Sequence, residues 1–345
     1  MKILLTGATG LIGCHAAAAL LEAGHAVRLL VRDPRKLDAV FAPFGRRAAD
    51  FEVVTGSIED AGALDDALSE CAGLLHAAGR FSPDRRDAAA LRATNVEGTR
   101  RVFEAAERAS RRAPLERIVY VSSILALFPA PGPCMRASDD VARPAEMYAA
   151  TKADAERIAR EAQSRLPLTI VYPAAVQGPD DPTFSVGPKL VADALVSGRV
   201  LVTEGGLPST DVRDLARLFV SIFGGAPHAA RMMAPAFFVE HADYHRLLRD
   251  LTGRDLRAQR LPGGLLRAIG RIGDVLGLLG RPIQLTSEAA AVLTRSVPVD
   301  DAEACRLIGP TPITAERSFG DLIAWMAATG RIPDAVAGRI APRRQ

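Results

Sequence analysis

The feature that most constrains the fold is a glycine-rich stretch near the start of the sequence. The apolar run "KILL" leads into "TGATGLIG", in which Gly7, Gly10 and Gly13 precede a longer apolar segment with helical spacing. Glycine allows a tight turn and a close approach of a ligand to the backbone, and a helix N-terminus offers free N–H groups to an anion. A buried strand, a phosphate-binding turn and a helix are therefore predicted here, with a plain glycine-rich turn as the alternative.

Short apolar runs alternate with longer helical patterns as far as Pro173. This alternation is typical of βαβ units, in which parallel strands form one sheet that helices cover on both faces. The sequence therefore predicts an α/β fold with a Rossmann-type, doubly wound parallel sheet. The strands of this sheet are expected at residues 2–7, 26–32, 51–56, 73–79, 117–123 and 168–173.

The pattern changes in the second half of the chain, where proline and glycine first become frequent and helical patterns then dominate. A change of this kind indicates a sheet domain followed by a smaller, mostly helical cap that binds the substrate. The expected division is a dinucleotide-binding domain of residues 1–173 plus about 209–240, a cap of about 174–208 plus 241–333, and a flexible tail of 334–345.

Composition and charge exclude several classes of protein. The formal net charge is only +3 over 345 residues and no basic block stands out, so no nucleic-acid partner is expected. The four cysteines are widely spaced without a CxxC pair, which predicts neither a metal site nor disulfides. The first apolar run is too short for a signal peptide, and no run reaches the roughly 18 apolar residues of a membrane span. We expect a cytoplasmic protein that acts on a small molecule.

The residues after the second predicted strand bear on the choice of cofactor. An acidic residue there holds the ribose hydroxyls of NAD, whereas a basic residue accommodates the 2′-phosphate of NADP. The sequence reads "LLVRDPRK": Arg32 follows the last apolar strand residue, Asp33 comes next, and Arg35 and Lys36 follow. We place Arg32 at the deciding position, so NADP(H) is the preferred cofactor and NAD(H) the alternative. A solvated basic turn would explain the same residues without a cofactor.

Several further motifs follow one another in a fixed order. They are "HAAG" at 76–79, "TNVEGT" at 94–99, "VYVSS" at 119–123, "YAATK" at 148–152, "YPAAVQGP" at 172–179 and "STDVRDLA" at 209–216. With these motifs and "TGATGLIG", the chain resembles the extended branch of the short-chain dehydrogenase/reductase superfamily, which includes the epimerase/dehydratase type. Within the branch, "VRDP" and the helical C-terminal third resemble the dihydroflavonol-reductase-like and 3β-hydroxysteroid-dehydrogenase-like members.

The resemblance implies a set of contacts to the dinucleotide. The pyrophosphate would lie on the glycine-rich turn, the adenosine near Arg32, and the nicotinamide beyond the sixth strand. Two positions depart from the family, because Ser57 stands where an aspartate is common and Tyr172 where an arginine often precedes the proline. The expected cofactor-binding residues are Gly7, Thr9, Gly10, Leu11, Ile12, Gly13, Arg32, Ser57, Ile58, Ala77, Ala78, Gly79, Tyr148, Lys152, Pro173 and Val176.

The resemblance also makes Ser123, Tyr148 and Lys152 the catalytic residues, with Asn95 assisting through a water-linked proton path. A tyrosine pKa of about 10 is too high for a base at neutral pH. A lysine four residues on lies one turn away on the same helix face, and its charge, with the cationic nicotinamide, would lower that pKa. Tyr148 could then exchange a proton with a substrate oxygen to which Ser123 donates a hydrogen bond.

Some of these residues have competing interpretations. Ser122 is an alternative to Ser123, although the interval from Ser123 to Tyr148 fits extended members better. His76 lies at a strand end and is expected to be structural. The aspartate pairs at 180–181 and 300–301 are expected to be solvated loop residues, so no metal site is predicted.

Three functions are compatible with the sequence. The favoured one is an NADP(H)-dependent oxidoreductase that interconverts an alcohol and a ketone or aldehyde on a bulky, apolar substrate. The second is a nucleotide-sugar epimerase or dehydratase with tightly bound NAD. Many such enzymes grip the diphosphate with a cap arginine just ahead of the segment that here reads "STDVRDLA"; this chain has Leu207 and Pro208 there, and Arg213 lies further on. The third is a non-enzymatic dinucleotide sensor, which would not need the catalytic residues.

An apolar stripe and the oligomeric state are left open by the sequence. Leu265, Ile269, Ile272, Leu276 and Leu279 recur at helical spacing, which is typical of a core-facing helix. An apolar substrate wall or a weak contact with a membrane surface are the alternatives. A homodimer through the helices that carry Asn95 and Tyr148 is common in the family and is an expectation here.

Overall fold

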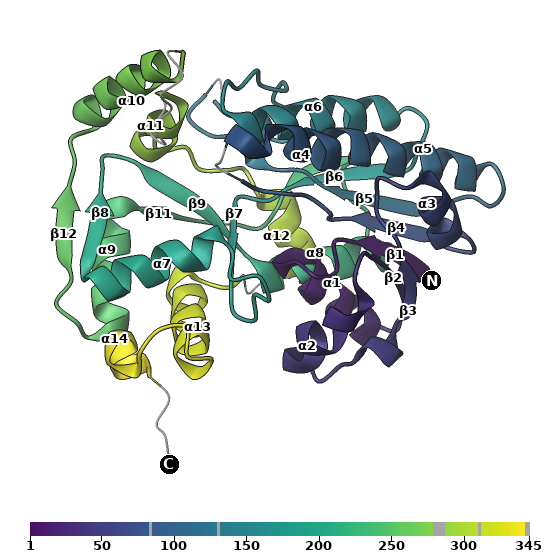
Figure 1. Cartoon of the computed structure of the whole chain (residues 1–345), viewed down its shortest axis with the longest axis horizontal. Helices are drawn as coiled ribbons and strands as arrows, with labels where there is room; N and C mark the ends of the chain where they lie inside the picture. The colour runs from purple at the N-terminus through teal and green to yellow at the C-terminus, as the bar shows by residue number, and fades with distance from the viewer. Residues whose placement is uncertain (83–84, 130–131, 279–286, 310–311, 342–345) are drawn as a thin grey trace.

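A computed structural model describes residues 1–82, 85–129, 132–278, 287–309 and 312–341 of the chain. Its centre is a seven-stranded parallel sheet with the order β10-β6-β5-β4-β1-β2-β3 (Figure 1). The predicted Rossmann-type α/β fold is therefore confirmed. The strands of this sheet are β1 (Lys2–Thr6), β2 (Ala26–Val31), β3 (Glu52–Thr55), β4 (Gly73–His76), β5 (Arg117–Val121), β6 (Leu168–Tyr172) and β10 (Arg231–Met233).

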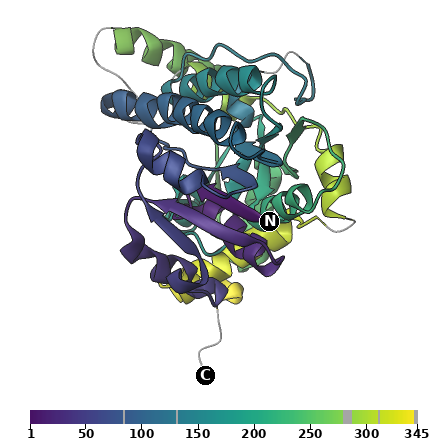
Figure 2. The same cartoon turned by 90° about the vertical axis from the view of Figure 1, so that its right-hand side faces the viewer.

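Helices cover both faces of the sheet, as Figure 2 shows. The face that includes Ile3 and Leu5 packs against α1 (Leu11–Glu22), α2 (Leu37–Phe41), α8 (Val212–Phe223) and α12 (Ala302–Ile308). The face that includes Leu4 is covered by α3 (Ala61–Leu68), α5 (Thr99–Ser110) and α6 (Met147–Ala162), and α4 (Ala88–Arg92) packs against α6.

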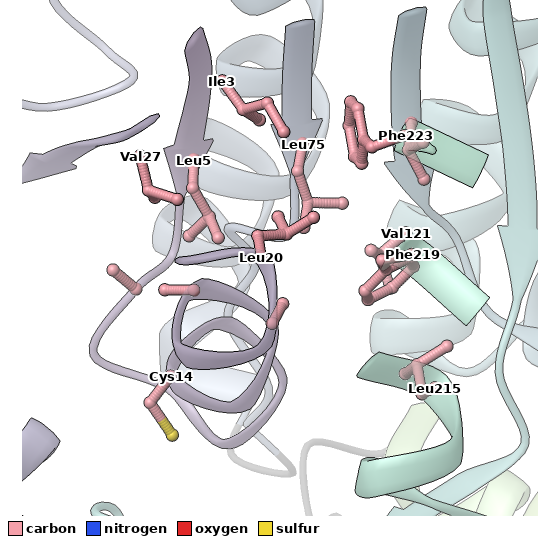
Figure 3. Packing of buried hydrophobic residues seen from close by; sticks show 14 of the residues in the cluster. Ile3, Leu5, Cys14, Leu20, Val27, Leu75, Val121, Leu215, Phe219 and Phe223 are labelled. Carbon is pink, nitrogen blue, oxygen red and sulfur yellow. The ribbon is translucent and has the colours of Figure 1, made fainter. Parts of the chain in front are cut away.

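Burial on both faces explains why the central strands are apolar without interruption. In β1, Ile3 and Leu5 point to one core and Leu4 to the other, and all three are fully buried. Figure 3 shows Ile3 and Leu5 beside Leu20 of α1, with Phe223 of α8 nearby. Because these strands are parallel, their carboxyl ends lie at one edge of the sheet, and the predicted site residues follow them there.

A second region carries its own hydrophobic core, which includes Leu195, Leu322 and Met326. It contains two small sheets, β11-β9-β7 and β12-β8. Strand β12 lies in the part of the chain where helical patterns were expected to dominate. Its strands are β7 (Ala175–Gln177), β8 (Arg199–Val202), β9 (Gly206–Asp211), β11 (Phe237–Glu240) and β12 (Arg257–Arg260). Its helices are α7 (Val186–Ser197), α9 (His241–Thr252), α10 (Gly263–Leu278), α11 (Ser287–Thr294), α13 (Ala315–Ala328) and α14 (Asp334–Ala337).

The segment 209–240 contributes to both regions. Helix α8 and strand β10 pack with the large sheet, whereas β9 and β11 pair with each other in the small one. The boundaries of the predicted domains stay predictions. The expected flexible tail is corrected over residues 334–341, because α14 and a 3₁₀ turn form there and Ala337 is buried in the core of the second region. The rest of that tail, 342–345, lies outside the described residues.

Helix α10 does not use the predicted stripe as a core face. Leu265 and Ile272 are 50% and 57% exposed, whereas Leu266, one position on, is buried. Ile269 is partly buried, and Leu279 lies outside the described residues. The interpretation of the whole stripe as core is therefore wrong. Within the described residues, no helix combines the length and apolar character needed to cross a membrane.

Candidate active site

The predicted site residues meet at the carboxyl edge of the large sheet. The glycine-rich turn follows β1, Ala77 to Gly79 follow β4, Ser123 follows β5 and Pro173 follows β6. The strand order runs outward in opposite directions from the neighbours β1 and β4. In open α/β sheets, ligands bind outside the carboxyl ends of the strands at such a switch point. The topology thus brings together residues that are far apart in the sequence.

The glycine-rich turn is shaped for a phosphate. Gly7 has φ +85°, and a Cβ there would lie 2.7 Å from the Ala78 nitrogen, while a Cβ on Gly13 would lie 2.1 Å from the Gly7 oxygen. A Cβ on Gly10, by contrast, would find its nearest neighbour 3.6 Å away, in a space that a ligand can use. Helix α1 has Gly10 as its N-cap, no capping side chain and no acid in its first turn. These features fit the binding of a pyrophosphate.

The two candidate residues after β2, Arg32 and Asp33, differ in their hydrogen bonds and exposure. The Asp33 carboxylate accepts hydrogen bonds from the Arg35 backbone and guanidinium, with Nε–Oδ1 2.8 Å and Nη2–Oδ2 3.1 Å. The Arg35 side chain lowers the pKa of Asp33. Arg32 is exposed, and no ion pair of its guanidinium occurs within the described residues. Contact of Arg32 with the cofactor stays a prediction.

Ser57 and Ile58 follow β3 on the same edge. The Ser57 hydroxyl accepts a hydrogen bond of 3.2 Å from the Glu59 backbone, and Ile58 is buried. Ile58 packs on Gly98, where a Cβ would lie only 2.6 Å from its Cδ1 atom. Ile58 thus has a packing role in this structure, and contact of either residue with adenine stays a prediction.

The two adjacent serines at the end of β5 have different surroundings. The Ser122 hydroxyl donates a 2.7 Å hydrogen bond to the buried carboxylate of Glu156. Ser123 caps the short 3₁₀ turn Ile124–Ala126, and its hydroxyl oxygen accepts from the Leu125 nitrogen at 3.2 Å, which leaves the hydroxyl hydrogen for another acceptor. Pro173 lies alongside, because its carbonyl accepts from the Ile124 nitrogen at 3.1 Å. This arrangement favours Ser123 as the residue that contacts a substrate.

Tyr148 is the second residue of α6, whose first turn is capped by Glu146 through a 2.8 Å bond from the Ala149 nitrogen. Its ring meets the Phe81 ring edge to face, with the centroids 4.8 Å apart, and Phe81 is 49% exposed. Burial, with a smaller effect from the Glu146 charge, raises the pKa of Tyr148 to about 12. In the chain alone, this direction is opposite to the decrease expected for a tyrosine paired with a lysine and a cationic nicotinamide.

Lys152 lies one turn further along α6 and is buried. Its ammonium donates to the Val121 carbonyl at 3.0 Å and to the Tyr120 hydroxyl at 3.4 Å, and lies 5.1 Å from the centre of the Tyr120 ring. Burial lowers the pKa of Lys152 to about 8, and the Glu156 charge opposes this decrease. Within the described residues no hydrogen bond joins Lys152 to Tyr148, and an effect of the lysine charge on the tyrosine stays a prediction.

Asn95 connects two parts of the site. It lies in the π-helical turn Ala93–Gly98, and its amide donates to the Arg80 carbonyl at 2.9 Å and to the Thr151 hydroxyl at 3.0 Å. Its Oδ1 atom accepts from the Arg80 nitrogen at 2.8 Å. Asn95 thereby fastens the segment that carries Phe81 to helix α6. A role in a water-linked proton path stays a prediction.

His76 has a structural setting, as expected. Its ring nitrogens lie 2.8 Å from the Thr6 hydroxyl and 3.1 Å from the Thr99 hydroxyl, and the ring stacks on Tyr120. Burial, followed by the charge of Lys152, lowers the pKa of His76 to about 3, so the ring is neutral at physiological pH.

The expectation of solvated loop residues holds for only part of the two aspartate pairs: Asp300 is exposed, whereas Asp181 and Asp301 are engaged within the fold. Asp181 is fully buried and accepts from the Thr183 and Ser185 nitrogens, and Asp301 accepts from the Ala236 nitrogen at 2.8 Å. Among the described residues, no group of three or more His, Cys, Asp or Glu side chains is placed to hold a metal ion.

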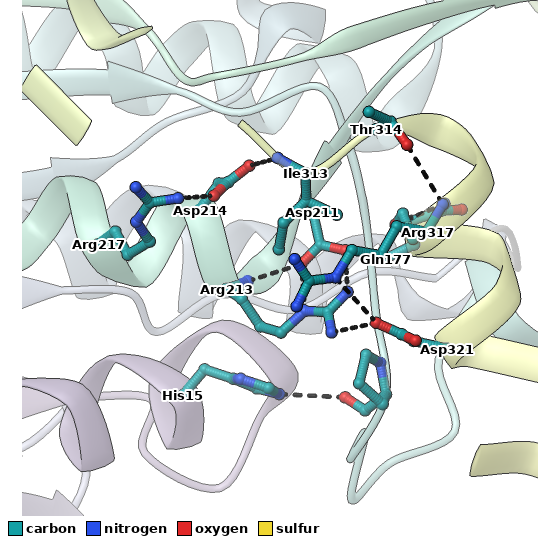
Figure 4. Close-up of polar contacts among 12 residues, drawn as sticks. His15, Gln177, Asp211, Arg213, Asp214, Arg217, Ile313, Thr314, Arg317 and Asp321 are labelled. Carbon is teal, nitrogen blue, oxygen red and sulfur yellow. Dashed lines mark hydrogen bonds and ion pairs between the residues drawn. The ribbon is translucent and has the colours of Figure 1, made fainter. Parts of the chain in front are cut away.

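Arg213 is engaged by two carboxylates, as Figure 4 shows. Its guanidinium donates to Asp211 through Nε and Nη2, both at 2.9 Å, and to Asp321 of α13 at 2.5 Å. The hydrogen bond to Asp211 is the largest cause of an increase in the pKa of Arg213. Its donors therefore tie α8 to α13, and they are not directed to a ligand.

Two residues near the site were missed at the level of sequence. Phe81 follows the "HAAG" motif, and no pattern marks it as a neighbour of Tyr148. Glu156 stands four residues after Lys152, so helical spacing places it on the face of Tyr148 and Lys152. That spacing was the available signal for Glu156.

Comparison with known proteins agrees with the fold and shows the family. A model of the NAD dependent epimerase/dehydratase family matches residues 3–226. The chain is 27% identical to sterol demethylase protein B of Methylococcus capsulatus over 338 residues, which are 96% of this chain and 100% of that protein. It is 29% identical over 327 residues to the 4-hydroxy-2-methyl-3-oxo-4-farnesyl-3,4-dihydroquinoline-1-oxide ketoreductase of Stigmatella aurantiaca, covering 90% of this chain and 91% of that one.

A solved structure, that of gox2253, superposes with a TM-score of 0.79 at 26% identity, covering 96% of this chain and 99% of the other. The match of the family model extends from β1 through α8 and so includes every predicted cofactor-binding and catalytic position. The resemblance inferred from the motifs is confirmed. The chain belongs to the NAD-dependent epimerase/dehydratase family and is an NAD(P)-dependent enzyme of the extended short-chain dehydrogenase/reductase type.

Proposed function

We propose that the protein is an NADP(H)-dependent oxidoreductase that interconverts an alcohol and a ketone or aldehyde on a bulky, apolar substrate. The observation that carries the proposal is the position of Tyr148, which has the exposed Phe81 ring at its edge and lies one helical turn from the buried Lys152 ammonium. A proton donor thus stands beside an apolar wall at the carboxyl edge of the sheet.

The residues of this chain supply the proton transfer. When bound, the cofactor would give or accept a hydride at the substrate carbon. In reduction, the Tyr148 hydroxyl donates its proton to the substrate oxygen as the carbonyl becomes an alcohol; in oxidation, the phenolate takes that proton back. Ser123 donates a hydrogen bond to the same oxygen and orients it. The Lys152 charge stabilises the phenolate that Tyr148 becomes after it has given up its proton.

The chemistry of the substrate is inferred from the surroundings of Tyr148 and from the relatives. Half of the Phe81 side chain is exposed, and an apolar ring or chain that covers it would gain hydrophobic free energy. The names of two relatives refer to a sterol and to a farnesyl-bearing ketone. The commitment of Arg213 to Asp211 and Asp321 gives no support to a nucleotide-sugar diphosphate as the ligand. NADP(H) is proposed because Arg32 is exposed while Asp33 is held by Arg35.

The test is a screen of ketones, aldehydes and alcohols with NADPH or NADP, followed by Tyr148→Phe. This change removes the proton but keeps the ring, so kcat should fall about 10²-fold or more while NADPH binding is retained. Tyr244→Phe, which alters a partly buried tyrosine of the second region, is the matched control and should retain activity. Unchanged turnover in Tyr148→Phe would contradict the mechanism. Turnover of a nucleotide sugar without net consumption of cofactor would favour an epimerase.

The homodimer also stays a proposal. Helices α5 and α6 would form its interface, as the resemblance implies. Light scattering after size-exclusion chromatography gives the mass in solution, and a monomer at micromolar concentration would contradict the proposal.

A further inference from the structure

Helix α6 carries four functional groups spaced four residues apart: Tyr148, Lys152, Glu156 and Arg160. This spacing aligns them along one side of the helix, each one turn from the next. Tyr148 and Lys152 belong to the proposed proton-transfer site. The proposed mechanism leaves Glu156 and Arg160 without a role, although Glu156 is fully buried.

The Glu156 carboxylate is fully engaged in hydrogen bonds. One oxygen accepts from the Ser122 hydroxyl at 2.7 Å; the other accepts from the Tyr172 hydroxyl at 2.5 Å and from Arg160 Nε at 2.9 Å. Arg160 also donates to the Tyr172 hydroxyl at 3.3 Å and to the Asp139 carbonyl at 2.9 Å. These contacts tie the carboxylate to the residue after β5, to Tyr172 of β6 and to Arg160 of its own helix.

This network explains the departure of position 172 from the family pattern. The resemblance leads one to expect an arginine on this strand before the proline, and the chain has Tyr172. In the structure, a positive charge reaches the Tyr172 hydroxyl and Glu156 from Arg160 of α6. The neutral tyrosine thus acts as a hydrogen-bond donor, and the helix supplies the cation.

The network is adjacent to the proposed catalytic residues on two sides. Directly after strand β5, Ser122 lies between Val121 and Ser123 in the chain. The Val121 carbonyl accepts a hydrogen bond from the Lys152 ammonium. On helix α6, Glu156 lies one turn from Lys152, and its charge opposes the loss of the lysine proton that burial favours. A single carboxylate therefore contacts the strand behind Ser123 and influences the charge of Lys152.

The other titratable groups around Lys152 are uncharged at neutral pH. Burial, then the Glu156 charge, raises the pKa of Tyr120 on β5 well above its usual value. Burial also raises the pKa of Tyr148, and it raises the pKa of Tyr172 on β6. His76 on β4 stays neutral, since its pKa is lowered to about 3. In the described chain, this leaves Glu156 and Arg160 as the formal charges of the surrounding network.

Building on the proposed function, we propose that Glu156 is a positioning residue of the active site, whose buried carboxylate lies one helical turn from Lys152 and holds the end of β5 behind Ser123. Arg160 supports this role by holding the carboxylate in place through its 2.9 Å hydrogen bond. Without Glu156, the lysine would lose its proton at a lower pH, and Tyr148 would lose the charge that stabilises its phenolate.

Lys152 can be titrated directly in the intact protein without a substrate. The chain has four lysines, Lys2, Lys36, Lys152 and Lys189. Incorporation of lysine labelled with ¹³C at Cε therefore gives four signals, and Lys→Arg changes at the other three positions assign them. In Glu156→Gln, the pKa of Lys152 should fall by on the order of one unit, because an opposite charge nearby has been removed. An unchanged Lys152 titration in folded Glu156→Gln would overturn the proposal.

Tyr172→Phe is the matched control, because it removes one hydrogen bond of Glu156 and keeps the charge. The Lys152 titration should then stay within a few tenths of a unit of the wild-type value, against the full charge effect in Glu156→Gln. Equal changes in the two variants would show a merely structural role and overturn the proposal. If Glu156→Gln does not fold, the double change Glu156→Gln/Arg160→Gln avoids an unpaired buried charge, and it should move the Lys152 titration in the same direction by less.

The pH dependence of ketone reduction provides the second readout. The upper limb of the kcat profile should move to lower pH in Glu156→Gln together with the Lys152 titration, and it should not move in Tyr172→Phe. The titration fails or succeeds independently of any substrate. Failure of the proposed function would instead appear as unchanged turnover in Tyr148→Phe, so the two results are distinguishable.

Discussion

At the scale of a single residue, Arg32 carries the proposed preference for NADP(H). Asp33 is close enough in sequence to bind ribose, but its carboxylate is already held by Arg35. Arg32→Ser should weaken NADPH binding about tenfold or more, since a charge-assisted bond to the 2′-phosphate is lost, and leave NADH binding nearly unchanged. Fluorescence titration with both cofactors measures the change. An equal loss for NADPH and NADH would contradict the assignment.

Phe81 permits a second prediction at the scale of a residue. Its ring packs against Tyr148 and is half exposed, so it should contact the apolar part of a substrate. Phe81→Ala should raise KM for bulky apolar ketones about tenfold, which corresponds to about 1.4 kcal/mol of lost aromatic contact. Small aldehydes, which cannot reach the ring, are the control and should be affected much less. A loss of the same size for both substrates would indicate that the change disturbs Tyr148 itself.

At the scale of an element, the start of α1 depends on a close approach of two backbone segments. A Cβ on Gly13 would meet the Gly7 carbonyl oxygen at 2.1 Å, so the helix and the turn cannot both keep their positions. Gly13→Ala should therefore lower the free energy of unfolding by at least about 2 kcal/mol and weaken cofactor binding. Chemical denaturation and NADPH titration measure the two effects.

Gly264 is the matched control for this prediction. It also lies in the first turn of a helix, α10, and a Cβ there would meet nothing within 4 Å. Gly264→Ala should stabilise the protein by up to about 1 kcal/mol, because alanine has less freedom to lose on folding. A similar loss of stability in both variants would argue against the close approach as the cause.

At the scale of the whole molecule, the active site reduces the stability of the fold. The pKa of Lys152 is lowered from 10.5 to about 8 by burial, so between these values the unfolded chain binds more protons than the folded chain. Stability should therefore rise as the pH rises through this range. The gain attributable to Lys152 is about 2–3 kcal/mol between pH 7 and pH 10, since a difference of one in pKa between the folded and unfolded chain corresponds to about 1.4 kcal/mol.

Lys152→Met tests this contribution, because it keeps the length of the side chain and removes the charge. The variant should lack that gain, should be more stable than the wild type at pH 7, and should lose turnover. Urea denaturation at several pH values measures the free energies of unfolding. The same pH slope in both proteins would show that Lys152 is not the source.

Local patterns in the sequence were enough to predict six of the seven strands of the large sheet and the order of the site residues along the chain, whereas β10 was not predicted. The spacing of Gly7, Gly10 and Gly13 and the alternation of strands with helices depend on neighbours in the chain, and parallel topology places every strand's carboxyl end at one edge. The second region was predicted less well. Its short strands pair with distant segments, as β8 does with β12, and no local periodicity announces such a pair.

The sequence alone therefore determined the fold class and the family, because motif spacing and apolar periodicity carry that information, and through the family resemblance it predicted the groups that do the chemistry. Only the tertiary structure decided how those groups are used. It placed Phe81 against Tyr148, committed Arg213 to Asp211 and Asp321, and assembled Ser122, Tyr172 and Arg160 around Glu156. The physical reason is that burial and hydrogen-bond partners depend on segments that meet only when the chain is folded.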